Sequence, residues 1–203
     1  AALADAEALH AMEPKSTLYQ EDIGLYATQL ARLRRLQDDA DAATRLTERS
    51  LQMLQLMLKQ SPDQPGWRRE LAEALVEQAE QAIASGRHDA AAAALREALA
   101  ILEPQLLQNP NDRAVVLATV SARLGLASLA PDSADARALA ARALATLDAQ
   151  TYGKRDPRLL VLRVEALRRL SRDQEAASMA AELASTGYRD VRPSRTTRVT
   201  GSA

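Results

Sequence analysis

The feature that most constrains the fold is a segment that recurs along the chain at a nearly constant interval. Pro62 and Pro110 mark similar polar turns 48 residues apart, and Pro157 follows 47 residues later. Between these turns the apolar positions also correspond at the same interval, with Leu51, Leu54 and Leu58 falling on Leu99, Leu102 and Leu106. A fixed period of tens of residues is typical of an array of repeats, each of which needs a neighbour to bury its apolar face.

The central repeat, residues 67–112, predicts two amphipathic helices joined by a tight turn. Its apolar residues recur at steps of three and four, which places them on one face of each helix; they are Leu71, Leu75, Ala79 and Ile83, then Ala91, Ala94, Leu95, Ala98, Leu99 and Leu102. Ser85-Gly86 ends the first helix, because glycine readily adopts the left-handed backbone of a helix stop. Asp89 is expected to cap the second helix. Pro104 is expected to bend that helix near Glu103 without ending it.

The same spacing predicts three further helix pairs, over 18–37 and 40–60, 113–130 and 133–149, and 157–170 and 173–186. We therefore expect about four helix pairs in residues 18–188, with a leading helix or linker over 1–17. Residues 151–155 are expected to form a polar loop. Residues 189–203 contain four arginines and few apolar residues, and we expect them to form a disordered basic tail.

Composition favours an all-α fold and argues against several classes of function. Apolar residues make up 47% of the chain but aromatic residues only 2%, so alanine and leucine must supply a core of closely packed helices. The 26 basic and 27 acidic residues nearly balance, which argues against a nucleic-acid or membrane-surface role. No apolar run approaches the ~20 residues of a membrane-spanning helix. There is no cysteine and hence no disulfide, which fits cytoplasm and periplasm equally.

Only the choice of amino acids suggests the origin of the chain. Arginine greatly outnumbers lysine and alanine is abundant, which indicates a bacterial protein from a GC-rich genome. The chain begins at Ala1 without methionine and without a signal peptide, and we expect it to be a piece of a longer protein.

No catalytic, cofactor-binding or metal-binding residue is predicted. His10 and His88 are remote from each other and there is no cysteine, so zinc-site spacing is absent. No glycine-rich phosphate loop and no nucleophile-elbow motif occurs. His88-Asp89 could imitate a catalytic dyad, but the turn between two helices accounts for both residues. The chain is therefore expected not to be an enzyme.

Residues of the central repeat resemble the tetratricopeptide repeat family. The resemblance lies in the pattern A-x(6)-G-R-x-D-x-A-x(6)-A-L, formed by Ala79, Gly86, Arg87, Asp89, Ala91, Ala98 and Leu99. Leu124-Gly125 and the later Arg172, Glu175 and Ala176 are similar to other family positions, so the likeness extends over about residues 18–189. It implies antiparallel helix pairs stacked as a right-handed α-solenoid that binds a peptide or protein in its concave groove.

The sequence departs from the family in ways that bear on the geometry. The interval is 47–48 residues instead of about 34, so longer helices are expected. The proline expected after the second helix comes late, at Pro110, and Leu95 replaces a large aromatic residue.

In the family the first helix of each pair lines the groove. On this basis, the candidate groove residues are those next to the buried apolar face of each first helix. They are Gln29, Arg32 and Arg35; Glu73, Glu77 and Glu80; Arg123; and Arg158, Glu165, Arg168 and Arg169. Such a groove would be basic, then acidic, then basic, and would select a partner of alternating charge. Glu77 and Glu80 are expected to reach solvent. A solvated helix face would use the same residues.

Two functions are compatible with these features. One is a non-catalytic scaffold that binds a peptide or partner domain in the charged groove. The other is a regulatory or dimerisation segment of a larger bacterial signalling protein. Residues 67–72 (WRRELA) and 183–190 (LASTGYRD) look like the C-terminal repeat regions that follow eukaryotic-like Ser/Thr kinase domains or winged-helix regulators. No kinase motif is present.

Overall fold

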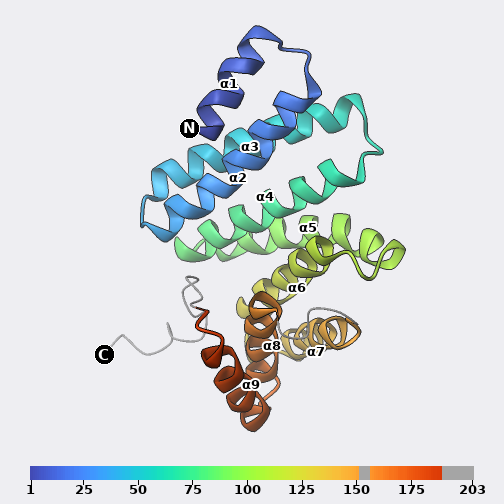
Figure 1. Cartoon of the computed structure of the whole chain (residues 1–203). Helices are drawn as coiled ribbons and strands as arrows, with labels where there is room; N and C mark the ends of the chain where they lie inside the picture. Colours follow the sequence, from blue (N-terminus) through green and yellow to red (C-terminus); the bar gives the residue numbers. More distant parts are fainter. Residues whose placement is uncertain (151–155, 189–203) are drawn as a thin grey trace.

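The computed structural model describes residues 1–150 and 156–188, which hold nine α-helices and no β-strand (Figure 1). The helices are α1 (Ala2–Met12), α2 (Thr17–Leu36), α3 (Ala40–Gln60), α4 (Pro65–Ala84), α5 (His88–Gln108), α6 (Arg113–Ser128), α7 (Ala134–Asp148), α8 (Pro157–Arg169) and α9 (Asp173–Ser185). The predicted all-α class is confirmed. The four predicted pairs correspond to α2–α3, α4–α5, α6–α7 and α8–α9. The expectations for residues 151–155 and 189–203 fall outside the described residues.

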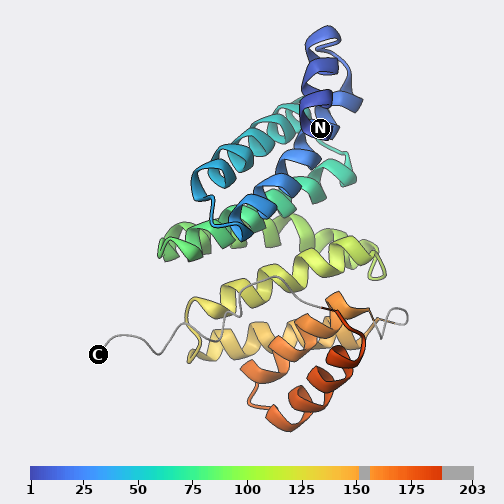
Figure 2. The same cartoon turned by 60° about the vertical axis from the view of Figure 1, so that its left-hand side comes forward.

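The helices follow one another in chain order along the length of the molecule, from α1 at one end to α9 at the other (Figures 1 and 2). Each helix packs on the next, and the first helices of the pairs also contact one another, α2 with α4, α4 with α6 and α6 with α8. The core accordingly forms as a succession of apolar clusters between neighbouring pairs. The first helices therefore form a continuous row, and this row positions the candidate site.

Local sequence explains several helix ends. Gly86 and Gly187 adopt left-handed backbone, with φ of 72° and 71°, after α4 and α9. Ser133 accepts a hydrogen bond from the Ala136 N–H at the start of α7. The predicted cap at Asp89 is wrong, because α5 already begins at His88 and Asp89 lies inside its first turn.

The helix α5 runs through Pro104 to Gln108 without ending, as the sequence predicts. Leu106 packs against the core, but Leu107 is 84% exposed and does not belong to the apolar stripe. Trp67, in the first turn of α4, is half-buried against a cluster that contains Met57 of α3.

The leading helix α1 is part of the packed structure. Its Ala6 is buried against Ile23 of α2 together with Met53 and Met57 of α3. In the described residues no helix is both long enough and apolar enough to cross a bilayer.

The helices α2 and α3 approach each other closely at Gly24. A β-carbon built there would lie 2.9 Å from the Cγ and Cδ2 atoms of the buried Leu54. The Ser50 hydroxyl donates to the Gly24 carbonyl at 2.7 Å and lies 2.7 Å from the Thr28 hydroxyl. The absence of a side chain at residue 24 therefore allows the two helices to make this contact.

Candidate binding groove

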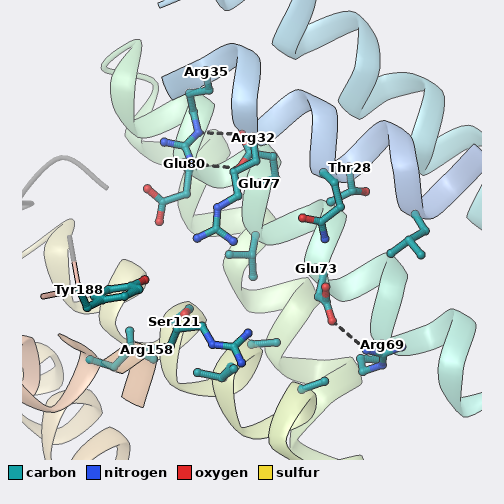
Figure 3. A pocket seen from close by; sticks show the side chains of 17 residues that line it. Thr28, Arg32, Arg35, Arg69, Glu73, Glu77, Glu80, Ser121, Arg158 and Tyr188 are labelled. Carbon is teal, nitrogen blue, oxygen red and sulfur yellow. Dashed lines mark hydrogen bonds and ion pairs between the residues drawn. The ribbon is translucent and has the colours of Figure 1, made fainter. Parts of the chain in front are cut away.

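The four first helices enclose a groove of about 400 Å³ along their row (Figure 3). Each helix contributes residues spaced by three or four, which lie on one face. The lining residues are Leu25, Thr28, Gln29, Arg32 and Arg35 of α2; Arg69, Glu73, Val76, Glu77 and Glu80 of α4; Ala114, Leu117, Ala118 and Ser121 of α6; Arg158 and Leu162 of α8; and Tyr188.

Seven of the residues selected from the sequence line this groove. They are Gln29, Arg32, Arg35, Glu73, Glu77, Glu80 and Arg158. Helical periodicity brings the α2 and α4 sets together because α2 and α4 lie side by side in the row. These residues give a surface that changes sign from one helix to the next.

Arg123 does not line the groove, contrary to the sequence-based expectation. Its guanidinium donates to the Thr146 hydroxyl of α7 at 2.8 Å and pairs with Glu103 of α5 at 3.1 Å. The side chain therefore joins α6 to the second helices on the other side of the row. Ser121, two residues earlier, is the polar residue that α6 presents to the groove.

Glu165, Arg168 and Arg169 also lie outside the groove. The helix α8 contributes only Arg158 and Leu162, from its first half. Glu165 and Arg169 instead pair with each other along α8 at 3.0 Å, and Arg168 is exposed. Of the α8 residues selected from the sequence, only Arg158 lines the groove, because the groove ends before the helix does.

Glu77 is buried, so the expectation that its side chain reaches solvent is wrong. Its two carboxylate oxygens accept hydrogen bonds from the Arg35 guanidinium, at 2.7 Å from Nε and 3.0 Å from Nη2. The Gln81 amide donates to the same carboxylate at 3.2 Å. A bidentate arginine–carboxylate pair is among the strongest charge-assisted contacts. Arg35 and Glu77 therefore hold α2 against α4 at the wall of the groove.

Arg69 is the main charged residue that sequence analysis missed. Its Nη1 atom lies 3.3 Å from the Glu73 carboxylate in the groove, and its Nη2 atom lies 3.5 Å from the Glu70 carboxylate. Arg69 stands four residues before Glu73, and this ion-pair spacing is the signal that could have identified it.

Arg32 is exposed and makes no hydrogen bond or ion pair within residues 1–150 and 156–188. In Figure 3 its guanidinium points into the groove. The Arg158 Nε atom lies 3.5 Å from the carboxylate of Asp156, and its side chain is half-exposed. Four arginines against three glutamates give the lining a small excess of positive charge.

Apolar side chains lie between the charges. Leu25, Val76, Leu117 and Leu162 come from all four first helices, and Tyr188 contributes a partly exposed ring just beyond α9. Charged groups beside accessible apolar surface suit recognition of a peptide-like segment, which carries both kinds of group.

Two carboxyls at the groove have altered acidity. Burial raises the pKa of Glu73, and Asp112 adds to this effect, while Arg69 and Arg32 oppose it. Burial and the neighbouring Glu21 raise the pKa of Glu70 to about 7. Glu70 is buried next to the groove residues and does not line the groove itself.

The arrangement is suited to binding. Among the described residues no group of three His, Cys, Asp or Glu side chains is placed to hold a metal ion. Comparisons of the chain with protein-family models, with curated proteins and with solved structures found no match.

Proposed function

We propose that this protein is a non-catalytic scaffold that binds a peptide or partner-protein segment in the groove between its first helices. In this proposal the helix pairs form a right-handed α-solenoid like that of tetratricopeptide repeat proteins, with longer helices. The packing of each first helix on the next supports this arrangement.

The observation that carries the proposal is the groove itself. It unites seven residues that were selected from the family resemblance and from helical spacing, and it combines charged, apolar and aromatic groups on a row of helices. A surface that combines ionic and apolar groups on fixed elements favours specific recognition. The basic, acidic and basic segments favour a partner whose charges alternate in the opposite order.

Site-specific photo-crosslinking tests this proposal. We expect a benzoylphenylalanine residue at Gln29 or Ser121 to capture a defined protein in cells of the source organism. The same residue at Arg96, an exposed position on α5 outside the groove, serves as the control. Equal capture from Arg96 and from the groove positions would contradict the proposal.

A regulatory or dimerisation segment of a larger bacterial signalling protein is the second candidate. It is favoured by exposed apolar side chains where α1 meets α2, since Leu9, Met12 and Leu18 are 43%, 79% and 62% exposed. Such residues often mark a surface that is covered in an assembly. If this candidate is correct, the protein should be dimeric by light scattering, and Leu9→Gln with Met12→Gln should make it monomeric. A monomeric wild-type protein would exclude dimerisation through this surface.

A further inference from the structure

Glu70 is a buried carboxyl directly behind the groove. It is 6% exposed, and its Oε2 atom is buried without a hydrogen-bond partner. Its other oxygen lies 3.5 Å from the Nη2 atom of Arg69, the limit of a hydrogen bond. A buried charge is costly unless its oxygens are paired. The site therefore accommodates Glu70 better as a neutral acid than as an anion.

The acidic side chains around Glu70 act in the same direction as its burial, and Arg69 acts against them. Glu21 and Asp22 act on it from α2, and Arg69 and Glu73 act on it from α4. Burial and then Glu21 are the largest influences that raise its pKa, to about 7, while Arg69 opposes them. Three acids and one base thus surround a carboxyl that can gain or lose its proton near neutral pH.

Arg69 connects this carboxyl to the groove. Its Nη1 atom is 3.3 Å from Glu73, a lining residue, and its Nη2 atom is 3.5 Å from Glu70. One guanidinium therefore contacts two carboxyls, of which one lines the groove and the other is buried behind it. Ionisation of Glu70 adds a negative charge that competes with Glu73 for the same cation.

We propose that Glu70 is a proton switch for the groove. When Glu70 is neutral, Arg69 pairs with Glu73 and the lining keeps its excess of positive charge. When Glu70 ionises, it draws Arg69 toward itself and adds a negative charge behind the lining. A negatively charged partner segment is then held more weakly above neutral pH than below it. This last consequence rests on the proposed function, whereas the switch itself does not.

Carbon-13 NMR of glutamate side-chain carboxyls tests the switch on the protein alone. In the wild-type protein one carboxyl resonance should titrate near pH 7, and Glu70→Gln should remove it. Glu73→Gln should move the midpoint to lower pH, because it removes a neighbouring charge and leaves Arg69 to Glu70. Arg69→Met should move it to higher pH. Glu97→Gln, on the exposed face of α5, should leave it unchanged.

Two results would overturn the proposal. One is a Glu70 midpoint near the ordinary value of 4.5. The other is a midpoint near 7 that neither Glu73→Gln nor Arg69→Met displaces, since burial alone would then control the proton.

Failure of the proposed function can be distinguished from failure of the switch. If groove positions capture no partner while Glu70 titrates as described, the switch stands without a binding role.

Discussion

At the scale of single residues, the Arg35–Glu77 pair determines how the wall of the groove is held. Glu77 is 5% exposed and bidentate with Arg35, so loss of either side chain breaks a buried, charge-assisted contact between α2 and α4. We expect Glu77→Ala to lower the free energy of unfolding by ~3 kcal/mol. Replacing both residues by methionine should recover most of that loss. Urea denaturation measures these values.

The control for this prediction is Glu97→Ala, which removes an exposed carboxylate from α5. Its effect on the free energy of unfolding should stay within ~0.5 kcal/mol. If Glu77→Ala proved as mild as Glu97→Ala, the pair would not stabilise the contact between α2 and α4.

The raised pKa of Glu70 leads to a second prediction at this scale. The pKa of this carboxyl is about 7 in the folded protein against an ordinary value of 4.5, so between these values the folded state holds a proton that the unfolded state has released. The stability this provides is complete below about pH 4.5, falls as pH rises, and is lost above about pH 7. The free energy of unfolding of Glu70→Gln, taken relative to that of the wild type, should therefore be ~1–2 kcal/mol higher at about pH 8 than at about pH 5, allowing for solvent screening.

Urea denaturation of both proteins at the two pH values gives this difference directly. Titrating groups that do not interact with Glu70 affect the wild type and Glu70→Gln alike, so their contributions cancel in the comparison. A difference in stability that does not change with pH would show that Glu70 has ordinary acidity in the folded state.

At the scale of helices, the contact of α2 with α3 depends on one missing side chain. A β-carbon at Gly24 would meet the buried Leu54 at 2.9 Å, whereas nothing lies within 4 Å of one at Gly66 in the first turn of α4. Alanine improves helix propensity at either position by up to ~1 kcal/mol. At Gly24, overpacking should exceed this gain and leave a net loss of ~1–2 kcal/mol. Thermal denaturation followed by circular dichroism should show Gly24→Ala melting lower and Gly66→Ala melting at or above the wild type. Equal melting temperatures for the two variants would refute the close approach.

Helix positions could be predicted from the sequence because the signals are local. Apolar steps of three and four, together with Gly86 and Pro157, place the elements near their observed bounds. Asp89 was misplaced as a cap because several residues of the turn can precede a helix, and only the backbone geometry selects among them. The close approach at Gly24 depends on Leu54, thirty residues away, and no local pattern indicates it.

At the scale of the whole molecule, the residues that line the groove could be predicted where first helices lie side by side. They could not be predicted where the groove ends along a helix or where a side chain contacts a second helix. The α2 and α4 residues were found because periodicity fixes a face. Arg123 was not placed correctly, because its partners Thr146 and Glu103 come from the second helices of two neighbouring pairs, whose positions depend on how those pairs pack. Burial of Glu77 likewise requires Arg35 from another repeat.

The central claim is that this groove is the binding surface, and one comparison tests it most directly. The affinity of the partner captured by cross-linking is measured calorimetrically for Arg32→Glu, in the groove, and for Arg96→Glu, outside it on α5; both arginines are exposed. We predict that Arg32→Glu weakens binding at least about tenfold, or ~1.4 kcal/mol, with an unchanged melting temperature. Arg96→Glu should change binding by less than about twofold. Equal losses for the two variants would contradict the account and point to the second helices as the interface.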